Sequence, residues 1–194
     1  GNVDSIIDKI CEEARKIIPG ENLGAVINKE SQDRIERYIT EAEKDGAKIL
    51  VDGRNTKVAG KEGGTYVGPT VIDYVKPGMS VATEEIFGPV ISIMRTNTVD
   101  EALAIENANP YGNAASVFTQ NGAMARYIIE KASAGMIGVN VGVPVPREPF
   151  SFGGWNESKF GVGDITGKSS IEFWTKLKKS TTKWNAEAGV NWMS

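Results

Sequence analysis

The chain has 194 residues, of which 40% are hydrophobic and 24% charged, a balance typical of a globular protein with a buried core. Its net charge of -3 offers no basic surface for nucleic acid, and its apolar runs are too short and interrupted to cross a membrane. One cysteine and no histidine exclude an internal disulfide, a Ser-His-Asp triad and most zinc sites, and indicate a reducing compartment. Because the chain starts with Gly1 and enters a helical pattern almost at once, we expect it to be a piece of a larger protein.

The first half of the chain predicts helices and strands in alternation. Apolar residues recur at helical spacing over residues 3–18 and 31–44, and Pro19-Gly20 and Gly46 follow these two runs. Three short apolar runs predict strands, at residues 47–51, 66–72 and 90–94. The last of these is nearly all apolar, which is typical of a strand covered on both faces of a sheet.

The second half continues the same rhythm. Thr98 and Glu101 form a capping box ahead of a helix that ends near Ala108, and Asn121 caps a second helix. Residues 116–118 and 136–141 predict strands on either side of that second helix. Strands joined through helices favour parallel pairing, so we predict an α/β fold with a mostly parallel sheet and flanking helices.

Glu85 and Phe87 are the first residues that suggest chemistry. They lie two positions apart, so both side chains project from one face of an extended segment, and Gly88-Pro89 permits a turn directly afterwards. A carboxylate can accept hydrogen bonds from both hydroxyls of a ribose, and a phenyl ring can pack against a flat heterocycle. From spacing alone, the favoured interpretation is that Glu84 and Glu85 are exposed loop charges and that Phe87 belongs to the core.

A family resemblance favours the chemical interpretation. Residues 83–90, Thr-Glu-Glu-Ile-Phe-Gly-Pro-Val, resemble a signature of the aldehyde dehydrogenase superfamily, and residues 67–72 resemble the strand that precedes it. Residues 109–119 and 141–146 resemble the CoA-acylating methylmalonate-semialdehyde dehydrogenase branch. The resemblance spans roughly residues 23–184. It implies an incomplete catalytic domain, the part that follows the nucleophile.

The resemblance also implies the site residues. Glu85 would bind the nicotinamide ribose of NAD, and Phe87 would lie against the nicotinamide. Phe152, with Phe150 as a second candidate, would line the aldehyde pocket. No catalytic residue and no metal ligand is assigned. Cys11 lies in the middle of a helical pattern beside two glutamates, which disfavour a thiolate, so we interpret it as structural.

The implied parent reaction oxidises a semialdehyde to an acyl-CoA through a cysteine thioester, with NAD as cofactor and CoA as acyl acceptor. We expect the isolated chain to be inactive, and the complete enzyme to be a homo-oligomer of the cytoplasm or, in a eukaryote, the mitochondrial matrix. Residues 1–168 would belong to the catalytic domain. Residues 169–194 would form a C-terminal helix, an oligomerisation strand at 178–183 and a tail.

Two departures from the family pattern leave the substrate open. Ala25 stands where proline is common, and residues 155–160 replace the usual small and basic residues after Gly153-Gly154. One alternative keeps the superfamily but makes the parent an NAD(P)-dependent hydrolytic aldehyde dehydrogenase. A second alternative is a non-catalytic α/β binding or assembly module.

Overall fold

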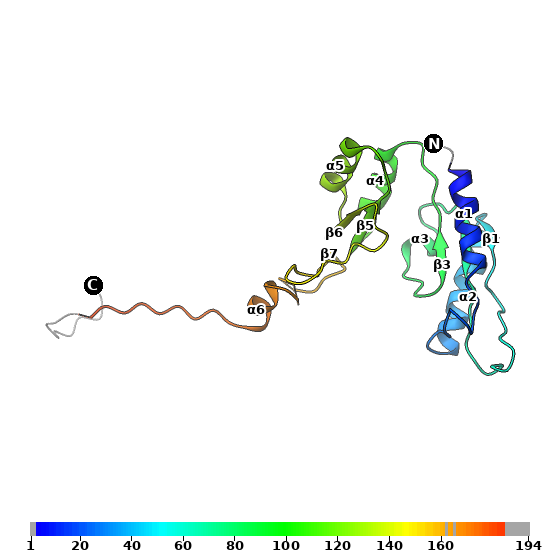
Figure 1. Cartoon of the computed structure of the whole chain (residues 1–194), viewed down its shortest axis with the longest axis horizontal. Coiled ribbons are helices and arrows are strands. Elements are labelled where there is room, and N and C mark those ends of the chain that lie inside the picture. Colours follow the sequence, from blue (N-terminus) through cyan, green and yellow to red (C-terminus); the bar gives the residue numbers. More distant parts are fainter. Residues whose placement is uncertain (1–2, 162, 165, 185–194) are drawn as a thin grey trace. The chain divides into compact units, whose positions relative to one another are not determined.

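The computed structural model describes residues 3–161, 163–164 and 166–184 and divides into two compact units, residues 1–105 and 106–194 (Figure 1). The division falls inside helix α4 (Val99–Ala108), a boundary that the sequence pattern did not predict. The separation of a catalytic portion, residues 1–168, from a C-terminal portion, residues 169–194, stays a prediction.

The first unit is built on a three-stranded sheet with the order β1-β2-β3. Strand β1 runs antiparallel to β2, with Ile49 opposite Ile72, and β2 runs parallel to β3, with Val71 opposite Ile91. The elements of this unit, besides the start of α4, are α1 (Asp4–Arg15), α2 (Lys29–Lys44), β1 (Lys48–Val51), β2 (Thr70–Asp73), α3 (Ser80–Thr83) and β3 (Val90–Ser92).

Helices α1 and α2 cover opposite faces of this sheet. Val71 and Ile72 are neighbours in β2, so their side chains point to opposite faces, and both are fully buried. Val71 packs against the apolar face of α1, whereas Ile72 packs against that of α2. The buried helix residues in these two clusters are Ile7, Cys11 and Ala14 from α1, and Ile35, Ile39 and Ala42 from α2.

An arginine links α1 to the end of the sheet. Arg95 donates from Nε and Nη2 to the carboxylate of Asp73, at 3.0 and 2.7 Å, and its Nη1 lies 2.7 Å from a carboxylate oxygen of Asp4. The guanidinium also lies over the ring of Tyr74, 4.5 Å from the ring centroid. Asp73 is buried, so this pairing supplies the partner that a buried carboxylate requires.

The second unit has two small sheets. Strand β5 runs parallel to β6 with α5 between them in sequence, and β4 runs antiparallel to β7. Asn121 caps α5 as predicted, because its Oδ1 accepts hydrogen bonds from the backbone of Ala123 and Met124. The elements are β4 (Tyr111–Gly112), β5 (Ala114–Val117), α5 (Gly122–Lys131), β6 (Met136–Val139), β7 (Trp155–Asn156) and α6 (Ser169–Trp174).

The α/β class predicted from the sequence is confirmed, with parallel pairing in β2–β3 and β5–β6 and antiparallel pairing in the other two contacts. Strands β1, β2, β3 and β6 are shorter than predicted. Strand β2 begins at Thr70 because Pro69 has no amide hydrogen and the amide of Gly68 donates to Gly53, 2.8 Å away. Strand β6 ends at Val139 because Asn140 turns the chain with a φ of 56°.

Candidate functional site

The segment from Glu84 to Pro89 leaves α3 and is held at two points. Arg34 of α2 donates from Nη1 to the backbone carbonyl of Glu85, at 3.2 Å. The amide of Thr70 in β2 donates to the carbonyl of Pro89, at 2.9 Å. The segment is therefore tied to both α2 and β2, which limits how far its exposed side chains can shift.

The close approach of this segment to α2 requires a glycine. A Cβ atom on Gly88 would lie 2.6 Å from Cδ1 of Ile35, whose side chain is fully buried. Any side chain at this position would displace core atoms of α2. Ile86 packs on the same core, while Glu85 and Phe87 are exposed on either side of it.

Phe87 differs from the expectation of an extended segment, because its φ is 53° and the chain therefore turns at Phe87 itself rather than after it. Left-handed backbone costs a non-glycine residue about 1–2 kcal/mol. The ring of Phe87 is also 78% exposed, so burial in this unit does not compensate for that cost. A strained backbone that presents an exposed aromatic ring is a combination that often marks a ligand site.

Glu85 and Phe87 thus lie on one short tethered segment, but not on the single extended face that their spacing predicted. Glu85 offers two carboxylate oxygens to a ligand, and Glu84 lies beside it, also exposed. Arg34 was missed by sequence reasoning. Its position within the second helix carries no pattern that distinguishes it from an ordinary exposed arginine, and only the contact with the carbonyl of Glu85 shows its place at the site.

Phe150 and Phe152 lie in the second unit, on the irregular loop between β6 and β7. Phe150 is 71% exposed and Phe152 is 36% exposed. The amide of Phe152 donates to Oγ1 of Thr166 at 2.8 Å, and the hydroxyls of Ser151 and Ser169 lie 2.8 Å apart. These bonds hold the loop against the start of α6 and leave the Phe150 ring mostly in solvent.

The glycine pair after Phe152 is needed for packing inside this loop. A Cβ atom on Gly153 would lie 1.9 Å from the Oδ1 of Asp164, which pairs with Nζ of Lys159 at 2.9 Å. Gly154 is buried, and Trp155 directly after it begins β7.

Cys11 is 5% exposed and packs in the cluster formed by α1 and Val71. This placement agrees with a structural role. Within the described part of the chain, no group of three or more Cys, Asp or Glu side chains comes close enough to hold a metal ion. Among the same residues, no helix combines the length and hydropathy that a membrane crossing requires.

The family model for the aldehyde dehydrogenase family matches residues 1–180, so the chain belongs to this family. The predicted resemblance is thereby confirmed. Within the family, the rat mitochondrial methylmalonate-semialdehyde/malonate-semialdehyde dehydrogenase [acylating] is 47% identical over 169 residues, which is 87% of this chain and 32% of the relative. The probable enzyme of the same name from Drosophila melanogaster is 44% identical over 190 residues, 95% of this chain and 36% of the relative.

Comparison with solved structures leads to the same family. The methylmalonate-semialdehyde dehydrogenase of Oceanimonas doudoroffii superposes with a TM-score of 0.91 at 38% identity, over 95% of this chain and 39% of that one. A putative methylmalonate-semialdehyde dehydrogenase from Sinorhizobium meliloti, complexed with NAD, also has a TM-score of 0.91, at 37% identity, over 96% of this chain and 39% of that one. The chain spans about a third of the length of the curated relatives named above.

Proposed function

We propose that this chain forms the nicotinamide-binding wall and part of the aldehyde pocket of a CoA-acylating, NAD-dependent methylmalonate- or malonate-semialdehyde dehydrogenase. The observation that carries the proposal is the tethered segment that presents Glu85 and the strained, exposed Phe87. The acylating relatives, which are 44–47% identical, support this branch of the family.

The two residues suit the nicotinamide half of NAD. The carboxylate of Glu85 accepts hydrogen bonds from the two ribose hydroxyls, and the ring of Phe87 packs against the nicotinamide and restricts its orientation. Arg34 keeps the backbone at Glu85 in place, so the carboxylate needs little rearrangement to meet the ribose. When bound, NAD accepts the hydride that is removed from the substrate carbon.

The rest of the reaction requires groups beyond this chain. Thioester formation needs a cysteine thiolate, and Cys11 is buried in the α1 cluster, so the nucleophile comes from another part of the complete enzyme. CoA then receives the acyl group. Phe152, together with Phe150, contributes apolar surface to the aldehyde pocket. We further propose a homo-oligomer in a reducing compartment, either the cytoplasm or the mitochondrial matrix.

The test uses a chimaera in which these 194 residues replace the matched segment of the Oceanimonas doudoroffii relative. Glu85→Gln should raise the KM for NAD about tenfold, because a charge-assisted hydrogen bond contributes roughly 1.5–3 kcal/mol. Glu84→Gln, which changes the neighbouring exposed carboxylate, is the matched control and should leave the KM unchanged. Direct titration with NAD checks both variants independently of turnover. Equal effects of the two substitutions would refute the assignment of Glu85.

The aldehyde pocket is tested separately. Phe152→Ala should raise the KM for the semialdehyde while leaving NAD binding intact, and Phe160→Ala, at a ring that is 94% exposed, is the control. Product analysis distinguishes the CoA-acylating branch of the family from the hydrolytic branch, since the acylating reaction yields an acyl-CoA only when CoA is present. Release of free acid at the same rate without CoA would favour the hydrolytic alternative.

A further inference from the structure

A supporting segment, residues 164 and 166–169, lies along the loop that would line the aldehyde pocket. A Cβ atom on Gly167 would lie 2.7 Å from the carbonyl oxygen of Pro149, and a Cβ atom on Gly153 would lie 1.9 Å from Oδ1 of Asp164. The order of these contacts is reversed along the chain, so the loop and the supporting segment run in opposite directions. The two pieces of chain are in close contact, and a side chain at either glycine would push them apart.

Two hydroxyl contacts join the supporting segment to the loop. Oγ1 of Thr166 accepts a hydrogen bond from the amide of Phe152 at 2.8 Å, and the hydroxyls of Ser151 and Ser169 lie 2.8 Å apart. Among the residues that the structure describes, no backbone–backbone hydrogen bond connects the supporting segment with residues 149–153. The amide of Phe152 therefore depends on a single side chain, that of Thr166, for its partner.

The chain that follows Phe152 gives it little restraint. Gly153 and Gly154 come directly after it, and glycine has access to a wider range of backbone angles than other residues. The side chain of Phe152 is 36% exposed, so packing fixes the ring only in part. The hydrogen bond to Thr166 is therefore the polar contact that sets the direction of the Phe152 backbone, and with it the position of the ring.

The supporting segment is itself held at both ends. At one end the carboxylate of Asp164 pairs with Nζ of Lys159 at 2.9 Å, and both side chains are mostly buried. At the other end Oγ of Ser170 donates to the carbonyl of Gly167 at 2.7 Å, beside the first turn of α6. Thr166 lies between these two contacts, so its hydroxyl is a fixed acceptor.

We propose that Thr166 is a positioning residue of the aldehyde pocket: its hydroxyl fixes the backbone of Phe152 and thereby holds the phenyl ring toward the semialdehyde. This inference rests on the role proposed above for Phe152. It adds a residue that acts through the backbone and does not itself need to touch the substrate. Loss of the hydroxyl should weaken binding of the aldehyde and leave NAD binding, the role proposed for Glu85 and Phe87, unchanged.

The experiment compares Thr166→Val and Thr166→Ser in the chimaera described above. Valine has nearly the shape of threonine but cannot accept the hydrogen bond, whereas serine keeps the hydroxyl. Thr166→Val should raise the KM for the semialdehyde about fivefold, the change expected for one lost hydrogen bond, and leave the KM for NAD unchanged. Thr166→Ser should restore the KM of the unmodified chimaera, and a KM that stays raised in this variant would overturn the proposal.

Thr98→Val is the matched control. Oγ1 of Thr98 accepts a hydrogen bond from the amide of Glu101 at 3.1 Å, so valine removes the same kind of contact from the first unit. This change should lower the free energy of unfolding about as much as Thr166→Val does, but it should leave the KM for the semialdehyde unchanged. An equal rise of the KM in both variants would show that it follows general stability, and would also overturn the proposal.

Phe152→Ala separates this proposal from the one on which it rests. If Phe152→Ala raises the KM for the semialdehyde and Thr166→Val does not, the positioning role is wrong while the assignment of Phe152 stands. If neither change raises it, Phe152 does not line the aldehyde pocket, and the positioning role is refuted with it.

A second measurement applies if the chimaera does not fold. Amide hydrogen exchange at Phe152 is then compared between the Thr166→Val and Thr166→Ser versions of the 194-residue chain. Exchange should be about fivefold faster in Thr166→Val, because the amide has lost its partner. Equal exchange in the two versions would show that Thr166 does not hold the Phe152 backbone.

Discussion

At the scale of single residues, Asp73 is a buried carboxylate of the first unit that is paired with Arg95. It is 1% exposed, and Arg95 donates to both of its carboxylate oxygens. Removing the charge of one partner in a buried pair is costly, and since Arg95 is partly exposed we expect Asp73→Asn to lower the free energy of unfolding by about 2 kcal/mol. Urea denaturation measures this value.

Asp33→Asn provides the matched control for Asp73→Asn. Asp33 pairs with Lys29 one helical turn away, and both side chains are mostly exposed, so its loss should cost less than about 0.5 kcal/mol. A similar loss in the two variants would mean that burial does not set the strength of the Asp73 pair.

The same pair predicts how stability depends on pH. The hydrogen bonds from Arg95 hold the pKa of the Asp73 carboxyl below its usual value. The stabilisation of the fold by the Asp73 carboxylate is therefore fully present above the unfolded-state pKa of about 4. This stabilisation is lost as the pH falls through the lower folded-state pKa. The difference in unfolding free energy between the unmodified chain and Asp73→Asn should stay constant from pH 8 to about pH 5 and shrink below about pH 4. A difference that grows on acidification would contradict this assignment.

Phe87 is expected to show a conflict between stability and function. Phe87→Gly removes the left-handed backbone penalty and loses little burial, so it should raise the free energy of unfolding by up to about 1 kcal/mol. The same change should weaken NAD binding in the chimaera. Ile27→Gly is the control: Ile27 is as exposed but has no positive φ, so this change should destabilise by about 0.5 kcal/mol. Destabilisation by Phe87→Gly would show that the ring is held by contacts within the unit.

At the scale of elements, the cap of α5 is the clearest single determinant. Oδ1 of Asn121 accepts from the amides of Ala123 and Met124, which have no partner within the helix. Asn121→Ala should lower the free energy of unfolding by about 1 kcal/mol, and Asn121→Asp should restore most of it because the carboxylate also accepts these bonds. Thermal unfolding followed by circular dichroism compares the three chains. Equal stability of the alanine and aspartate variants would contradict the capping role.

The longer elements were predictable because they carry repeating signals. The apolar spacing of α1 and α2 and the caps Thr98 and Asn121 specify their helices locally. The short elements α3, β4 and β7 were not predicted, since two to four residues carry no periodic signal. Tertiary contacts alone define them: Gly112 of β4, for example, pairs with Trp155, a residue distant in sequence.

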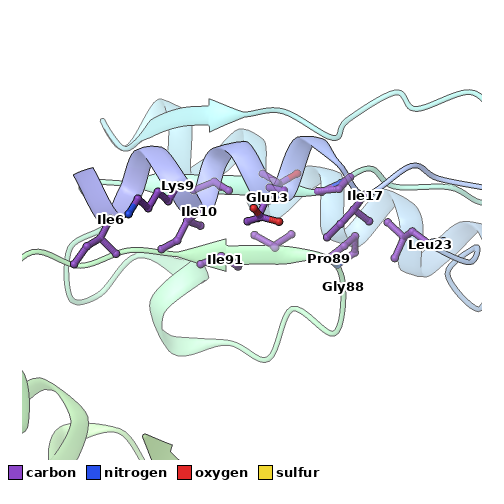
Figure 2. A pocket seen from close by; sticks show the side chains of 14 residues that line it. Ile6, Lys9, Ile10, Glu13, Ile17, Leu23, Gly88, Pro89 and Ile91 are labelled. Atoms are coloured by element: carbon purple, nitrogen blue, oxygen red, sulfur yellow. The ribbon is translucent and has the colours of Figure 1, made fainter. Parts of the chain in front are cut away.

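The candidate site was predictable in a different way. Glu85 and Phe87 were identified by motif resemblance, whereas the turn at Phe87 had no local signal other than the neighbouring Gly88-Pro89. The contact from Arg34 joins residues 51 positions apart, so only the folded chain reveals it. Sequence reasoning treated residues 90–94 as a covered strand, whereas Ile91, on β3 beside α1 (Figure 2), is 50% exposed in the part of the chain that the structure describes.

At the scale of the whole molecule, we expect the 194-residue chain to be catalytically inactive. Its one cysteine is buried, and the proposed nicotinamide wall and aldehyde surface supply binding groups without a nucleophile. An assay with NAD, CoA and methylmalonate semialdehyde should give no acyl-CoA above a control without protein. The chimaera serves as the positive control. Turnover by the isolated chain, abolished by Cys11→Ser, would reverse our interpretation of Cys11.

The last prediction concerns association through the C-terminal segment. Residues 176–184 form no helix or strand and are exposed, with Leu177 at 84% and Trp184 at 91%; residues 185–194 lie outside the described part of the chain. The family resemblance assigns residues 178–183 to a strand that pairs across subunits, so unpaired backbone there should drive self-association. Light scattering after size exclusion should show oligomers that become monomers on truncation after Leu177. Ile91→Glu should leave them intact, because Ile91 lies on β3 and not in residues 178–183. Oligomers that survive truncation but are lost in Ile91→Glu would place the contact at β3 instead.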